Sequence, residues 1–140
     1  LGREYEAVVH GGFRDDAGTV DAPIGRHPVD RKRMAVTPKN SKPAVTHYEV
    51  IARYRGYTRI LCRLETGRTH QIRVHMASIG HPLLGDGVYG APCPEKGLEG
   101  QCLHALRLKF IHPRTGQLVR LEAPLPEYFT QVISRLGNEI

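Results

Sequence analysis

Alternating apolar and polar residues are the feature that most constrains how this chain can fold. The alternation runs from Arg3 to His10, through two segments on either side of Gly56, and again through "CLHALRLKF", with "LVRLEAPLP" as its hairpin partner across "RTG". A period of two is typical of strands that bury one face. The chain is therefore expected to fold around a β-sheet.

One helix is expected in the middle of the chain. Ile72, Met76 and Ile79 lie at i, i+4 and i+7, which predicts a helix from about Thr69 to Ile79 with these three residues in the core. Gly80 is expected to end this helix. A second helix is expected in "PEYFTQVISRLG", whose proline suits the first turn. The first helix then separates two groups of strands.

The region 18–43 is rich in Gly, Pro and charged residues. It is expected to be a long functional loop with short extended pieces at Val20 and at Met34–Val36. With this loop in place, the order of elements is strands, helix, strands, helix. That order predicts an α+β fold with a mixed, mostly antiparallel sheet and a few helices.

Size and charge narrow the possible functions. The 140 residues suffice for one domain, and the sequence contains no run of about 18 apolar residues that would suggest a membrane span. The first residues lack the apolar core of a signal peptide. Lys and Arg number 20 against 14 Asp and Glu, which gives a net charge of +6 and a pI near 9.5. Nucleic acid is the leading candidate partner; a generally basic soluble protein is the alternative.

Cysteine and histidine spacing argues against metal and disulfide chemistry. Cys62, Cys93 and Cys102 are odd in number and show no CxxC spacing, so neither a disulfide scaffold nor a zinc site is expected. Cys62 lies within an apolar alternation and is expected to be a small core residue. His70 and His75 are five residues apart and no HExxH occurs, so no metal is expected. A reducing cytoplasm is the simplest compartment.

Basic residues cluster where the first helix begins. The stretch "LETGRTHQIRVHM" places Arg68, His70 and Arg73 around a helix N-terminus, where the helix dipole disfavours cations. If Thr69 caps this helix, Ile72 points to the core and Arg73 lies beside it, so its charge needs a partner. That partner is either a phosphate, bound by helix N–H groups and Arg68, or a carboxylate held bidentately by Arg73. A solvated basic helix start is the alternative.

Five segments carry a resemblance to a known family. They are "RLETGRTHQIRVHMASIGHPLLGDGVYG", "REYEAVVHG", "GTVDAPIGRHP", "KPAVTHYEV" and "LHALRLKFIHP". Together they resemble the RluA-type pseudouridine synthases, most closely the branch of the ribosomal large-subunit pseudouridine synthase D, over nearly the whole chain. The resemblance implies the pseudouridine synthase catalytic fold and a cofactor-free isomerisation of uridine in large-subunit ribosomal RNA. It also implies a flipped-out base and a cytoplasmic enzyme without metal that is a monomer when intact.

The resemblance also implies roles for individual residues. The tyrosine that stacks on the base and can take its C5 proton corresponds to Tyr5, and the arginine that pairs with the catalytic Asp corresponds to Arg73. On this interpretation, Arg73 faces a buried carboxylate. Arg68, with His70 or Gln71 and the exposed helix N–H groups, then holds the RNA backbone near the target.

The catalytic Asp of the family lies in an "HRLD" motif upstream of Tyr5, and no HRLD occurs here. Asp86 in "GDGVYG" is instead expected to form an Asx-type turn. The chain is therefore expected to be the C-terminal part of a catalytic domain, without the segment that carries the nucleophile and without an N-terminal RNA-binding domain. On its own it is expected to make no pseudouridine.

A basic loop offers a second RNA contact. "RHPVDRKRM" concentrates Arg31, Lys32 and Arg33 between Gly and Pro residues, and mobile basic loops bind phosphates; a solvated loop is the alternative. Two other functions are considered for the chain. One is a non-catalytic RNA-binding module, for which an aromatic content of 6% gives a thin stacking platform. The other is a His-dependent nuclease, which the offset spacing of His70 and His75 argues against.

Overall fold

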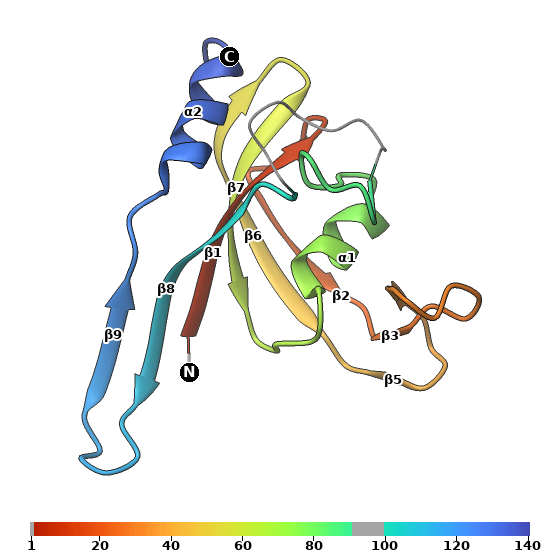
Figure 1. Cartoon of the computed structure of the whole chain (residues 1–140), viewed down its shortest axis with the longest axis vertical. Helices are drawn as coiled ribbons and strands as arrows, with labels where there is room; N and C mark the ends of the chain where they lie inside the picture. Colours follow the sequence, from red (N-terminus) through yellow and green to blue (C-terminus); the bar gives the residue numbers. More distant parts are fainter. Residues whose placement is uncertain (1, 91–99) are drawn as a thin grey trace.

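A computed structural model describes residues 2–90 and 100–140 of the chain. Six strands form one sheet in the order β2-β6-β7-β1-β8-β9, and every pairing in it is antiparallel (Figure 1). The strands are β1 Gly2–His10, β2 Ala17–Asp21, β6 Val45–Tyr54, β7 Tyr57–Leu64, β8 Leu103–Ile111 and β9 Leu118–Glu122. The predicted strands are confirmed, including the hairpin around Gly56, whose φ is 82°.

A small second sheet lies within the region that was expected to be a loop. Its three strands pair in the order β4-β3-β5, with bounds β3 Ile24–Arg26, β4 Met34–Val36 and β5 Ser41–Lys42. The extended pieces at Val20 and Met34–Val36 are confirmed, but the description of region 18–43 as one long loop is wrong. Strands of two or three residues are too short to show a periodic pattern in the sequence.

The two helices cover opposite faces of the large sheet. Helix α1 spans Gln71–Ser78 and helix α2 spans Glu127–Arg135 (Figure 1). On β1, Ala7 and Val9 pack in one cluster with residues of α1, whereas Val8 packs in another with residues of α2. Because side chains alternate along a strand, adjacent residues of β1 serve different cores. The α+β fold with a mostly antiparallel sheet is confirmed.

Helix α1 starts two residues later than the sequence predicts. It begins at Gln71, its N-cap is His70 in the left-handed region with φ 56°, and no side chain caps it. Thr69 is therefore not the cap. At the other end, Gly80 (φ 86°) donates to Ala77 and the next N–H donates to Met76, an arrangement that ends the helix as expected.

The buried stripe of α1 is broader than expected. Ile72 and Met76 are buried, but Ile79 is 39% exposed, so its assignment to the core is wrong. Val74 is buried instead, because it faces Ile24 and Ala44 of the small-sheet region. Cys62 is fully buried, as expected, whereas Cys93 lies outside the described residues. No helix in the described part of the chain is long and apolar enough to cross a membrane.

Candidate active site

A hollow of about 160 Å³ opens between β1 and the N-terminus of α1. Four of the site residues predicted from the sequence line this hollow: Tyr5, Arg68, His70 and Gln71. The half-buried Tyr5 packs against the core cluster that includes Ala7, because i and i+2 on a strand share a face. Tyr5 and the basic turn before α1, which carries Arg68 and His70, therefore lie at one site.

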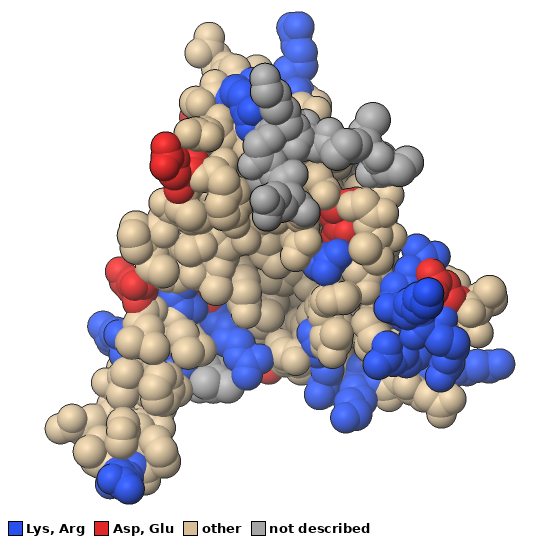
Figure 2. All heavy atoms as spheres, viewed as in Figure 1, with Lys and Arg blue, Asp and Glu red and all other residues tan. Residues whose placement is uncertain are grey.

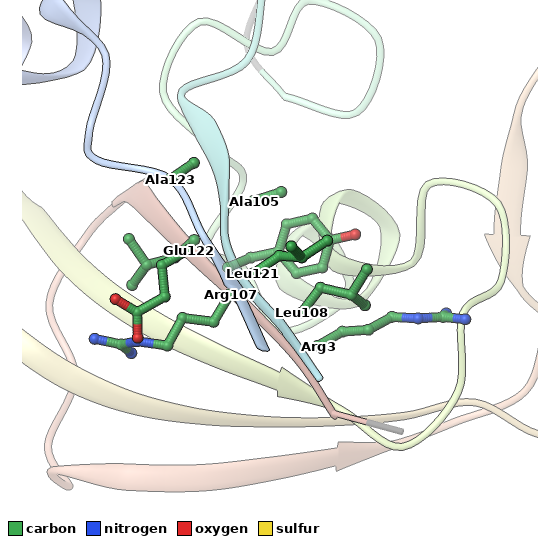
Figure 3. A pocket seen from close by; sticks show the side chains of 9 residues that line it. Arg3, Ala105, Arg107, Leu108, Leu121, Glu122 and Ala123 are labelled. Atoms are coloured by element: carbon green, nitrogen blue, oxygen red, sulfur yellow. The ribbon is translucent and has the colours of Figure 1, made fainter. Parts of the chain in front are cut away.

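A larger hollow of about 370 Å³ adjoins the other side of Tyr5, between β1, β8 and β9. Figure 3 shows Arg3 and Leu108 on one side of it and the Arg107–Glu122 pair on the other. Arg107 donates to Glu4 at 3.0 Å and lies 3.4 Å from Glu122. The second hollow therefore has apolar walls and a charged margin.

Arg3 lines both hollows and was not selected from the sequence. Its guanidinium lies against Gly67, where an added Cβ would overlap Nη1. Within residues 2–90 and 100–140, the side chain of Arg3 makes no hydrogen bond or ion pair. Position i−2 relative to Tyr5 on the same strand was the signal that could have revealed it.

Arg73 is paired within the chain. Its Nε donates to Asp86 Oδ2 at 2.8 Å and its Nη2 donates to Oδ1 at 3.1 Å, while the exposed fractions of the two side chains are 12% and 0%. Burial opposes ionisation of Asp86, but hydrogen bonds from Arg73 and from the backbone N–H groups of Tyr89 and Val88 outweigh it and lower the pKa of this carboxyl. The pair is therefore a charged, buried, bidentate ion pair.

This arrangement corrects one expectation and confirms another. Arg73 does face a buried carboxylate, but this carboxylate is Asp86 of the same chain, which was expected only to form a turn; the pairing of Arg73 with the catalytic Asp of the family stays a prediction. The Asx-type turn at Asp86 is confirmed, because Oδ1 accepts from the N–H groups of Val88 and Tyr89. Arg73 is absent from the lining of both hollows beside Tyr5. The sequence gives no sign of this pairing, because Arg73 and Asp86 are thirteen residues apart and belong to different local patterns.

Gln71 is buried, and its amide is fully engaged by the protein. Its Nε2 donates to Val45 O and Thr46 Oγ1, both at 2.9 Å, and its Oε1 accepts from Thr66 Oγ1 at 2.7 Å and Arg68 N at 3.0 Å. These bonds tie the basic turn to β6. Gln71 therefore shapes the hollow and holds the Arg68 backbone in place.

His75 extends this hydrogen-bond network into the core. It is fully buried; its Nε2 donates to Ala22 O at 2.8 Å, so its Nδ1 accepts from Thr46 Oγ1 at 2.8 Å. Burial lowers the pKa of His75, and the Ala22 hydrogen bond and Asp21 only partly offset this. A neutral, buried His75 cannot share a nuclease site with His70 on the surface.

We expect the stability of the fold to depend on pH through His75. An unfolded histidine titrates near pH 6.5; the lower folded pKa means that the unfolded chain binds more protons below that pH. Stability is therefore complete above about pH 6.5 and falls as pH decreases, by up to about 1.4 kcal/mol per pH unit. Urea unfolding across this range measures the slope. His75→Gln, which does not titrate, should flatten it; an unchanged slope would contradict the assignment.

The β3–β4 hairpin carries the second group of predicted RNA contacts. Arg31 and Lys32 are exposed, whereas Arg33 is half-buried and bonds to His27 and to Val88 O. Figure 2 shows Lys and Arg side chains gathered over this small-sheet region. The structure thus separates two exposed cations at the tip from one that fixes the hairpin to the loop after α1.

Among the described residues, no group of three or more His, Cys, Asp or Glu side chains is arranged to hold a metal ion. His70 lies beside the smaller hollow, and its Nδ1 is 2.8 Å from the Tyr89 hydroxyl. Burial and the charge of Arg73 lower the pKa of the His70 ring, and Asp86 only partly offsets them. A neutral His70 beside two arginines makes a site that suits an anionic, hydrogen-bonding ligand.

Comparison with known proteins defines the class. Residues 1–78, more than half of the 140-residue chain, match the RNA pseudouridylate synthase family. The chain therefore belongs to this family. It is 50% identical over 143 residues to ribosomal large subunit pseudouridine synthase D of Escherichia coli, covering 94% of the chain and 43% of that protein.

Two further comparisons agree. The uncharacterized RNA pseudouridine synthase YlyB of Bacillus subtilis is 54% identical over 136 residues, covering 96% of the chain and 44% of the relative. The structure of human RNA pseudouridylate synthase domain containing 1 superposes with a TM-score of 0.77 at 27% identity, covering 96% of this chain and 65% of that one. The chain thus spans less than half the length of these two bacterial relatives.

Proposed function

We propose that this chain contributes the base-stacking tyrosine and the basic rim of a uridine site, and that the full-length protein isomerises uridine to pseudouridine in large-subunit ribosomal RNA. The observation that carries the proposal is the hollow in which Tyr5 meets Arg68 and His70. Relatives at about 50% identity that are named ribosomal large subunit pseudouridine synthase D support the choice of RNA. The alternative is a non-catalytic RNA-binding module.

The proposed reaction needs only positioned protein groups. A flipped uridine enters beside Tyr5, its N1–C1′ bond breaks, the uracil turns, and a C5–C1′ bond forms. The C5 proton leaves and N1 gains one, so the atoms balance without a cofactor. Stacking on Tyr5 holds the free uracil, and the Tyr5 hydroxyl oxygen receives the C5 proton as it gives up its own proton towards N1.

The cations surround this position. Arg3, Arg68 and His70 line the hollow and are proposed to contact phosphates flanking the flipped nucleotide. Arg31 and Lys32 at the β3–β4 tip are proposed to contact phosphates farther away, whereas Arg33 supports the hairpin. Gln71 is proposed to act by holding this basic turn.

The catalytic carboxylate is proposed to come from a segment outside this chain. In the described part, the sole carboxylate residue that lines either hollow beside Tyr5 is Glu122, which pairs with Arg107. Asp86 occupies Nε and Nη2 of Arg73, which leaves Nη1 for a second carboxylate. We further propose that the intact enzyme acts as a cytoplasmic monomer without metal or cofactor.

Tritium at C5 of uridine gives a direct test. The full-length protein, mixed with large-subunit ribosomal RNA labelled at C5, is expected to release tritium to solvent without shortening the RNA. The isolated 140-residue chain is expected to bind this RNA and release none. Binding by the full-length protein without tritium release would favour the RNA-binding module, and strand scission would point to a nuclease.

A further inference from the structure

Two residues outside the predicted site, Asp86 and Tyr89, hold Arg73 from two directions. Asp86 grips Nε and Nη2, and the guanidinium carbon lies 4.9 Å from the centre of the Tyr89 ring. Asp86 Oδ1 also accepts from the Tyr89 N–H at 3.1 Å, which fixes the ring relative to the carboxylate. A cation held by a bidentate carboxylate and an aromatic face has little rotational freedom.

The Tyr89 hydroxyl extends this arrangement to the basic turn. Its oxygen accepts from the backbone N–H of Met34 at 3.0 Å and lies 2.8 Å from His70 Nδ1. This oxygen accepts from Met34 and keeps one proton of its own, which lies within hydrogen-bond distance of Nδ1. Donation of that proton to Nδ1 places the proton of the neutral His70 ring on Nε2, and this is the tautomer assigned in the proposal below.

The same hydroxyl also fixes the β3–β4 hairpin. Met34 is the first residue of β4, directly after the basic tip, and Arg33 donates to Val88 O at 3.4 Å beside Tyr89. One side chain thus connects the phosphate-binding hairpin, the helix N-terminus and the buried arginine. His70 needs such support, because a non-glycine residue at φ 56° is strained.

We propose that Asp86 and Tyr89 are positioning residues of the active site: Asp86 sets the guanidinium of Arg73, and Tyr89 sets the tautomer of His70 and its distance from the basic hairpin. The proposal rests on the proposed function for its catalytic consequence. Neither residue touches the substrate. The two act on different steps, because Arg73 serves the reaction whereas His70 and the hairpin serve RNA binding.

Each residue has a substitution that removes a defined interaction. Asp86→Asn retains Oδ1 for the Val88 and Tyr89 N–H groups and for Arg73 Nη2, but it removes the negative charge and presents an NH₂ to Arg73 Nε, so the bidentate contact that orients the guanidinium is lost. Tyr89→Phe retains the ring over Arg73 and removes only the hydroxyl. Asp16→Asn is the matched control, because Asp16 pairs with Arg53 at 2.7 Å while its side chain is 94% exposed.

The test measures RNA affinity and single-turnover tritium release in the full-length protein. Asp86→Asn is expected to lower the rate of tritium release from the bound complex about 30-fold, as for a displaced catalytic group. RNA affinity should change less than about threefold. Tyr89→Phe is expected to weaken RNA binding about fivefold, the value of one hydrogen bond, with little change in turnover. Asp16→Asn should match the wild type. Equal losses of affinity and rate in both variants would overturn the proposal.

NMR of the same proteins separates this proposal from the proposed function. The Arg73 Nε–H resonance should exchange slowly in the wild type and in Tyr89→Phe and be lost in Asp86→Asn. The His70 ring should be the Nε2-protonated tautomer in the wild type and a mixture in Tyr89→Phe. If the wild type releases no tritium, the proposed function fails, and these resonances still decide the positioning. Unchanged resonances in both variants would overturn it.

Discussion

Replacing Arg73 with Met is expected to destabilise the fold by about 3–5 kcal/mol. The substitution keeps a chain of similar length but leaves the Asp86 carboxylate, whose side chain is 0% exposed, without its cation. A buried ion pair adds little relative to apolar residues, but breaking one by removing a single partner leaves an uncompensated charge. Urea unfolding by linear extrapolation measures the change.

Two further variants separate this cause from a general loss of packing. Adding Asp86→Asn to Arg73→Met removes the unpaired charge and is expected to recover at least about 1 kcal/mol. Arg63→Met provides the surface comparison, because Arg63 is 52% exposed and its Glu49 partner is 49% exposed, and it should cost less than about 1 kcal/mol. Equal losses at both arginines would contradict the role of burial.

The sequence was most informative where a period extended over many residues. The alternation in β1, β7 and β8 located these strands, and "PEYFTQVISRLG" located α2. In the small β4-β3-β5 sheet only β4 was expected as an extended piece, because strands of two or three residues are too short to show a period. The start of α1 was misplaced because Thr69 has the preferred capping side chain, whereas the structure uses His70 in a left-handed conformation that no propensity scale anticipates.

At the site, the sequence supplied residue types but not partners. The charge of Arg73 beside the core predicted a partner that was either a phosphate or a carboxylate, and in the structure it is a carboxylate. Asp86 could not be identified as the partner of Arg73, because the two meet only when the loop after α1 folds back on the helix. They are thirteen residues apart in the sequence, and such a tertiary contact leaves no periodic signal. Tyr89 was missed for the same reason, because its role depends on contacts with Met34 and His70.

The second large effect is expected at Tyr5. In the full-length protein, Tyr5→Phe keeps the aromatic ring and removes the hydroxyl that is proposed to receive the C5 proton. General acid–base groups contribute about 10²–10⁴-fold to rates, so single-turnover tritium release should fall by about that factor. RNA affinity should change little, because the ring still stacks on uracil. Tyr5→Leu removes both functions and should also weaken binding to an RNA that carries the target uridine.

Tyr48→Phe is the matched control for this prediction. Tyr5 pairs with Cys62 and Cys62 pairs with Tyr48 across β1, β7 and β6, so both tyrosines occupy one row on one face of the sheet. Tyr48 lies outside the two hollows beside Tyr5, so the Tyr48→Phe variant should release tritium at the wild-type rate. If Tyr5→Phe retains wild-type release while Tyr5→Leu loses it, the ring alone matters, and another group must take the C5 proton. If both Tyr5 variants remain active, Tyr5 does not contact the base, because no stacking partner in a closed site can be exchanged for leucine without loss.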